Sequence, residues 1–291
     1  MDEALILCRA LHYSAAIMLF GASVFQETSP PTDLARFIAP PMRRLAALAI
    51  VIIFLTTIAW LMLESGEMGG GWVDASSPNT VSTVLFETEF GRVWQWRLGF
   101  VAILLGLLMS RRYGNWRVIA FWSALVLASL GFVGHGAMQT GVEGLLHRSS
   151  HSLHLLAAGL WLGALLPLLA CLRVLRHATL GEDVEIALRR FSYLGYVAVA
   201  TVLITGVANT WFVFEVWPIG LWSSYRALLV AKIGLVAAML GLAIVNRFVL
   251  TPRLRTSVEA PRQLRVNTIA EVVLGFSAIA LVSAFGTFAP E

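Results

Sequence analysis

Eight long apolar segments restrict this 291-residue chain to a helical membrane protein. Each segment has about the 20 residues that a helix needs to cross a bilayer, and none shows the alternating pattern of a barrel strand. The expected spans are residues 4–25, 42–63, 93–110, 117–138, 151–172, 191–213, 226–248 and 267–288. Apolar residues make up 58% of the chain and charged residues only 13%, which excludes an ordinary soluble enzyme. We therefore expect an all-α polytopic protein with one transmembrane domain, residues 1–291.

The charged residues are sorted between the two sets of loops. One set holds 15 of the 21 lysines and arginines, whereas the other set is acidic. Because basic loops stay on the cytoplasmic side, this bias predicts that both termini are periplasmic in a bacterial inner membrane. The net charge of +4 then reflects membrane sidedness. It gives no reason to expect a nucleic-acid partner, and membrane lipid is the expected surrounding.

The longest loop, residues 64–91, lies on the acidic side. It contains three consecutive glycines at 69–71, followed by Trp72 and Asp74. Glycines favour turns, and a tryptophan can anchor a segment at the membrane interface. We expect this segment to form an ordered external lid.

Two parts of the chain share a pattern. Residues 11–21 and 153–163 both read L-H-x-x-A-A-x-x-x-x-G, in helices expected to run in the same direction. This similarity predicts a parallel four-plus-four duplication, with one repeat over about 1–140 and the other over about 145–291.

The duplication pairs chemically similar side chains in the two halves. His12 would correspond to His154, and Arg97 in the third span to Lys232 in the seventh. An ionisable side chain inside a membrane is costly, so each of these residues is a candidate for function. Arg97 and Lys232 could snorkel to the interface, pair with a carboxylate such as Asp74, or bind anionic groups of a cofactor.

Histidines concentrate near the outer ends of the predicted spans. His147, His151 and His154 have the spacing i, i+4, i+7, which places them on one helix face, and Trp161 continues that face inward. Imidazole together with thioether suits copper, whereas imidazole alone also suits zinc, nickel or haem iron. The candidate metal ligands are His12, His135, His147, His151, His154 and Met138.

Two further residues lie deeper along a possible pathway. Met18 is farther inward on the first span, and Glu271 lies about one turn from the inner end of the eighth. Glu271 could be a ligand or proton carrier at the exit, or it could form a salt bridge with Arg265 or Arg247. Together with Trp161 and Asp74, these residues are the candidates for the pathway and its gating.

The segment 151–167, HSLHLLAAGLWLGALLP, resembles the H-x-x-H-x6-W-x-G-G-L-x-P signature of the CopD copper-resistance membrane proteins. The resemblance extends over essentially the whole chain and is strongest to the short YebZ-like branch; Ala164 stands where a second glycine is usual. It implies copper movement across the inner membrane and a small periplasmic CopC-like copper chaperone as partner. It also implies His135, His151 and His154 as outer metal ligands, with His12 deeper.

Three functions remain open at this point. The first is a copper permease that takes up copper from the periplasm and is not an enzyme. The second is a b-type haem protein for electron transfer, with His12 and His154 as axial ligands and with Arg97 and Lys232 near the propionates. The third is a membrane scaffold that docks a periplasmic copper chaperone, in which the lid would carry the function.

Overall fold

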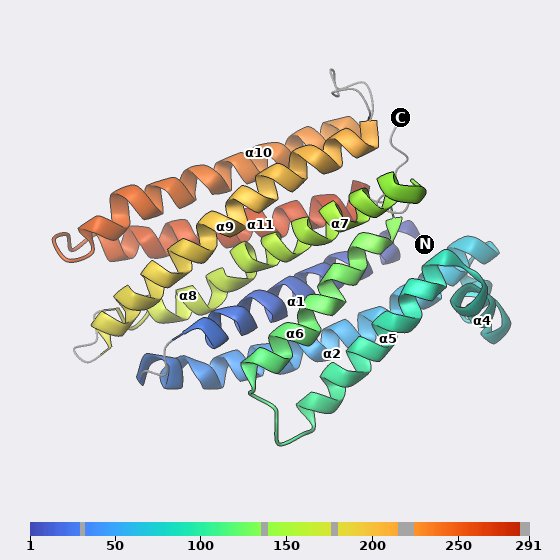
Figure 1. The fold of residues 1–291 in the computed structure, drawn as a ribbon, viewed down its shortest axis with the longest axis horizontal. Helices are drawn as coiled ribbons and strands as arrows, with labels where there is room; N and C mark the ends of the chain where they lie inside the picture. The colour runs from blue at the N-terminus through green and yellow to red at the C-terminus, as the bar shows by residue number, and fades with distance from the viewer. Residues whose placement is uncertain (30–32, 135–138, 176–179, 215–223, 286–291) are drawn as a thin grey trace.

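A computed structural model describes residues 1–29, 33–134, 139–175, 180–214 and 224–285 of the chain. Within these ranges the secondary structure is entirely helical, with long helices running antiparallel to one another (Figure 1). The all-α architecture predicted from the apolar segments is therefore confirmed.

The first half of the chain supplies four long elements. They are α1 (Asp2–Thr28), α2 (Asp33–Gly69), α5 (Glu89–Leu108) and α6 (Trp116–Ala128), the last continued by the 3-10 turn η1 (Ser129–Phe132). α1 contacts α2 and α6 along its length and carries a large share of the buried residues, so it forms the centre of this half.

The second half repeats the up-and-down course but interrupts two of its helices. Its elements are α7 (Gly141–Ala158), the π-helical turn η3 (Gly159–Gly163), α8 (Ala164–Leu172), α9 (Gly181–Phe214), α10 (Ser224–Val245), the π-helical turn η4 (Asn246–Leu250), the 3-10 turn η5 (Thr251–Arg253) and α11 (Ala260–Phe285). The turn η3 directly precedes a helix containing Pro167, which has no N–H to donate to the preceding turn. Such π-helical turns often occur at functional sites.

Six helical stretches in the described part of the chain are long and apolar enough to cross a membrane. They correspond to six of the eight expected spans. The other two expected spans, 93–110 and 117–138, match α5 and α6. α6 with η1 is a shorter apolar stretch, and α5 carries Glu89, Arg92 and Arg97 within 20 residues.

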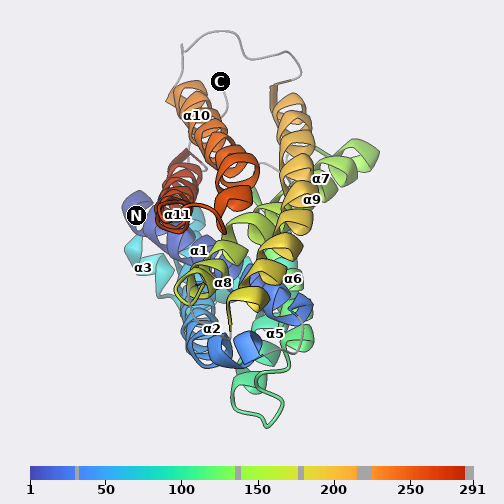
Figure 2. The same ribbon diagram turned by 90° about the vertical axis from the view of Figure 1, so that its left-hand side faces the viewer.

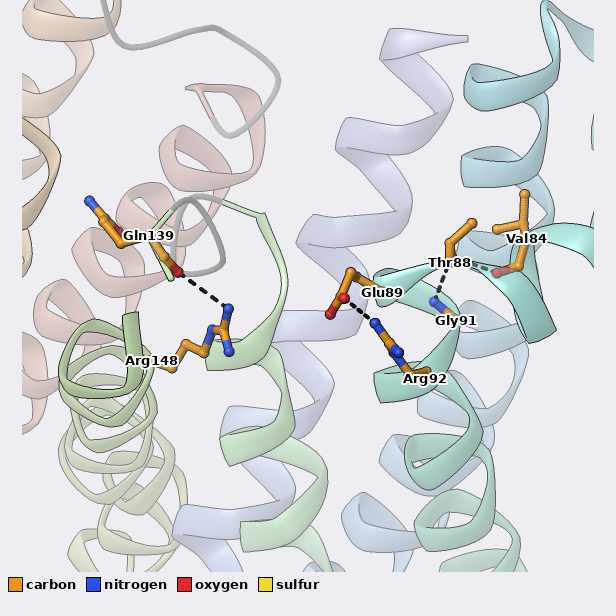
Figure 3. A network of polar contacts seen from close by, with 7 residues as sticks. All are labelled: Val84, Thr88, Glu89, Gly91, Arg92, Gln139 and Arg148. Atoms are coloured by element: carbon orange, nitrogen blue, oxygen red, sulfur yellow. Dashed lines mark hydrogen bonds and ion pairs between the residues drawn. The ribbon is translucent and has the colours of Figure 1, made fainter. Parts of the chain in front are cut away.

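The segment 64–91, expected to form an ordered external lid, is mainly helical apart from a turn at Gly70 and Gly71. α2 continues to Gly69, and the helices α3 (Trp72–Ala75) and α4 (Pro78–Glu87) occupy most of the segment. The Ser77 side chain accepts a hydrogen bond from the Thr80 amide and so caps α4. Thr88 caps α5 in the same way through the amide of Gly91 (Figure 3).

Close backbone contact joins α1 to η3. A Cβ atom added to Gly21 would lie 2.2 Å from the carbonyl oxygen of Gly159, and one added to Gly163 would lie 2.1 Å from the carbonyl oxygen of Ile17. The glycines at 159 and 163 therefore permit this close helix approach. In contrast, α9 and α10 form an edge of the bundle (Figure 2). Both helices expose many apolar side chains, as surfaces facing lipid do.

The two ends of the bundle differ in chemistry. The start of α1, the start of α7 and the end of α11 lie together, at the right of Figure 1, and we call this the histidine end. The opposite end carries the arginine-rich connections, including residues 109–115 and 251–259, and we call it the arginine-rich end.

Candidate metal-binding cavity

A cavity of about 170 Å³ lies at the histidine end, between the two halves of the bundle. All three histidines of the α7 face line it, namely His147, His151 and His154. We call it the histidine cavity. Its other charged lining residues are Arg9, Glu64 and Lys232, from α1, α2 and α10 respectively. The helical spacing of the histidines thus brings three imidazoles to one site, as the sequence predicts.

Gln139 holds His147 in place in the first half of α7. Its Nδ1 lies 2.7 Å from Gln139 Oε1, and its ring stacks on Phe212 of α9 at 5.0 Å between centroids. Gln139 also donates to the Phe212 carbonyl oxygen and accepts from Arg148, the second contact being visible in Figure 3. The His147 ring lies roughly parallel to that of His151, with centroids 6.5 Å apart. Gln139 thus fixes the orientation of the His147 imidazole through Nδ1.

His154 is oriented by a hydroxyl group of α9. Its Nδ1 lies 2.9 Å from Thr205 Oγ1, and that hydroxyl in turn donates to the carbonyl oxygen of Thr201. The threonine oxygen therefore accepts from Nδ1–H, which leaves Nε2 as the nitrogen with an available lone pair. Metal-binding histidines commonly have their other ring nitrogen fixed in this way.

His12 has an almost identical arrangement in the first half, but it is sealed. Its Nδ1 lies 2.8 Å from Thr56 Oγ1, whose hydroxyl donates to Ile52. Its Nε2 accepts from the Arg97 guanidinium at 2.7 Å, and both His12 and Arg97 are 0% exposed. Both ring nitrogens are therefore engaged within the protein.

The ligand role expected for His12 does not fit this geometry. A metal or a haem iron would have to displace Arg97, which would deprive a buried cation of its histidine acceptor. The structure thus provides no pair of open axial histidines at 12 and 154. The suggested pairing of Arg97 with Asp74 is wrong. Arg97 donates to Ser129 and lies over the Trp94 ring. Asp74 accepts a hydrogen bond from Thr80 instead.

The other expected ligands divide into two groups. His135 and Met138 lie outside the described residues, although the adjacent Gly134 lines the histidine cavity. Met18 is half-buried in α1 and is not among the lining residues of this cavity. Among the described side chains no group of three or more histidines, cysteines and carboxylates has metal-binding geometry. The α7 histidines are therefore together in one cavity without forming a closed ligand set.

Several lining residues were not predicted from the sequence. Arg9 and Glu64 form an ion pair at 3.7 Å, Trp60 donates to the same carboxylate, and Tyr13 lies beside them. The sequence predicts a span that ends at residue 63 and so places Glu64 in an external loop, whereas α2 continues to Gly69. The available signal was the continuation of helical spacing from Trp60 to Glu64, one turn later.

The lid segment does not cover this cavity. Glu64 and Phe90 at its two ends line the histidine cavity, but none of the described residues between them does. α3 and α4 instead contact α2, and α4 contacts α5.

Two further cavities continue from the histidine cavity toward the arginine-rich end. A middle cavity of about 110 Å³ shares Tyr13, His151, His154 and Lys232 with it, and is otherwise mainly apolar. Its lining includes Met239, a buried thioether that sequence analysis did not select. A third cavity of about 160 Å³ contains Glu271 and is called the glutamate cavity below.

The two residues expected on the inward pathway meet at the boundary of these cavities. Trp161, in η3, lines both the middle and the glutamate cavity. Glu271 accepts a hydrogen bond from Asn246 Nδ2 at 2.6 Å, and the Trp161 indole lies beside the same carboxylate. The alternative salt bridge with Arg265 or Arg247 is wrong, because within the described chain no ion pair involves Glu271, and Arg247 donates to Tyr196 instead.

Known proteins resemble this chain along its full length. Its sequence is 31% identical to Inner membrane protein YebZ of Escherichia coli, with 98% of each chain aligned. It is 30% identical to Copper resistance protein D of Pseudomonas syringae, covering 100% of this chain and 98% of that protein. This chain belongs to the copper resistance protein D family.

Two family profiles divide the copper resistance D sequence into parts. The profile of the copper resistance protein D-like N-terminal domain matches residues 1–145, and that of copper resistance protein D matches 185–285. The α7 histidines fall between the two profiles. Copper transport protein CutJ of Bacillus subtilis is 27% identical over 85% of this chain but only 46% of its own length. No solved structure is detectably similar.

Proposed function

We propose that this copper resistance D family member is a copper permease that takes up copper from the periplasm. The observation that carries the proposal is the presence of His147, His151 and His154 in a single cavity at one end of the bundle. Imidazole nitrogens bind copper well, and a set of two or three of them is weak enough to release it again. Copper is the transported substrate here, and no enzymatic reaction is needed.

The orientation of the protein follows from the charges of its two ends. α5 and α6 complete an eight-helix bundle with the six long apolar stretches. Placing the arginine-rich end in the cytoplasm puts both termini and the histidine cavity on the periplasmic side of a bacterial inner membrane. Copper would then enter from the periplasm.

The two halves are best understood as duplicated units that have diverged. His12 with Thr56 joins α1 to α2, and His154 with Thr205 joins α7 to α9 in the same way. The basic residue of the first half closes on its histidine, whereas Lys232 lines the cavity in the second half. On this account the first histidine stabilises the fold and the second binds copper.

The path inward begins with soft or borderline ligands. Below His154 the middle cavity offers the thioether of Met239, a good ligand for reduced copper. Trp161 closes the far side of this cavity.

A small CopC-like periplasmic carrier would deliver copper at the histidine end. This part of the proposal extends from the relatives, whose names refer to copper resistance and copper transport.

Copper uptake into proteoliposomes containing only this chain tests the proposal. Replacing both His151→Ala and His154→Ala should abolish uptake, while Glu67→Gln, at an exposed acid on the same end, should leave it unchanged. Unchanged uptake by the double variant would contradict the proposal. The scaffold alternative predicts a different result. Wild-type protein alone would then give no uptake in proteoliposomes, whereas cells that also contain a copper chaperone would take up copper fully.

A further inference from the structure

Glu271 is a buried carboxylate that copper capture does not use. It lies on α11 and is 3% exposed. Its polar neighbours are neutral, namely the Asn246 amide, which donates to it, and the Trp161 indole, which lines the same cavity. Asn246 is itself fixed, because its Oδ1 accepts from Asn267 Nδ2 at 2.9 Å. A lone carboxylate at such a depth is costly to keep charged and is a default candidate for proton transfer.

The surroundings of Glu271 favour a proton over a metal ion. Arg247 and Tyr196 are the other ionisable groups among the described lining residues of the glutamate cavity, and they bond to each other at 3.1 Å. No second carboxylate, histidine or cysteine lines the cavity in the described chain. A divalent or soft cation would therefore find a single charged ligand group, too few for firm binding, whereas a proton needs only one.

Both partners of Glu271 lie on π-helical turns. Trp161 is in η3 and Asn246 is in η4. These turns interrupt the regular backbone hydrogen bonding of two different helices at the same place in the bundle. Since π-helical turns are frequent at functional sites, their meeting at one carboxylate marks this place as more than helix packing.

We propose that Glu271 takes up and releases a proton from the cytoplasmic side, and that this exchange opens and closes the passage at Trp161. When Glu271 is ionised, it accepts from the Trp161 indole and holds that side chain across the boundary between the middle and glutamate cavities. When a proton binds, the carboxylate loses its charge and the charge-assisted bond from the indole weakens. Trp161 can then move, and the cavities join. The role in copper movement rests on the proposed permease function.

Proton uptake by Glu271 can be measured without any transport. Infrared difference spectra recorded between mildly acidic and mildly alkaline pH should contain a carboxylic-acid band that is absent from Glu271→Gln and shifted in Trp161→Phe. Glu259→Gln, at an exposed acid near the same end, should retain the band. A spectrum that is the same in wild type and Glu271→Gln would overturn the proposal, whether or not the protein moves copper.

Coupling to copper is tested in proteoliposomes that contain a pH-sensitive dye. Copper entry through wild-type protein should be accompanied by a pH change and should respond to an imposed pH gradient. Glu271→Gln should lose that response while keeping wild-type copper affinity at the histidine cavity. Equal gradient dependence in the two proteins would overturn the coupling. Loss of copper binding in the His151→Ala and His154→Ala variant, with the infrared band intact, would separate the two sites.

Discussion

The contact between α1 and η3 gives the sharpest prediction on stability. A methyl group added by Gly21→Ala would lie 2.2 Å from Gly159 O and 2.6 Å from Gly163 Cα, and both neighbours are backbone atoms that cannot rotate away. Ordinary contact begins at 3.4 Å. The helices must therefore separate by roughly 1 Å, and overpacking of this kind costs about 1–3 kcal/mol.

Gly99→Ala is the matched control for this substitution. Gly99 is also helical, but an added Cβ there meets nothing within 4 Å. Because alanine has the higher helix propensity, this variant should be neutral or more stable by up to about 1 kcal/mol. Thermal unfolding of the purified protein in detergent measures both changes. Equal unfolding temperatures for Gly21→Ala and Gly99→Ala would refute the account of this contact.

Three further predictions concern single hydrogen bonds. Thr205→Val removes the hydrogen bond that orients His154 and should weaken copper binding about 10-fold or more. Thr56→Val, which removes the matching bond to His12, should leave copper binding unchanged. Equal copper affinities of the two variants in titrations would contradict this prediction. His12→Ala removes one of the two hydrogen-bond acceptors of buried Arg97 and should cost about 3 kcal/mol in unfolding free energy, with copper stoichiometry unchanged. A loss of bound copper from folded His12→Ala protein would instead show that His12 is a ligand. Thr88→Ala removes the cap of α5 and should cost about 1 kcal/mol, measured by the same thermal unfolding, and no change would show the cap to be unimportant.

Local sequence patterns predicted the elements but not their partners. The apolar segments located the helices, and the spacing of His147, His151 and His154 placed all three on one helix face, which the structure shows lining a single cavity. The enclosure of His12 by Arg97 was not predictable, because it depends on how helices from distant parts of the chain pack. The repeated pattern around His12 and His154 thus leads to two different environments, one sealed by Arg97 and one open to the histidine cavity.

The ends and irregularities of helices were also missed for physical reasons. The glycines at 69–71 favoured a loop, but Ser77 followed by Pro78 is a strong helix start and the segment became helical. The turns η3 and η4 left no periodic signal, since a single inserted residue does not change apolar spacing enough to be read. They nevertheless place Trp161 and Asn246 against Glu271.

The central claim is that copper binds at the α7 histidines, and X-ray absorption of the copper-loaded protein tests it most directly. The account predicts nitrogen ligation with the scattering pattern of imidazole, lost in the His151→Ala and His154→Ala variant and retained in Thr56→Val. An unchanged copper spectrum in the double histidine variant would contradict the account.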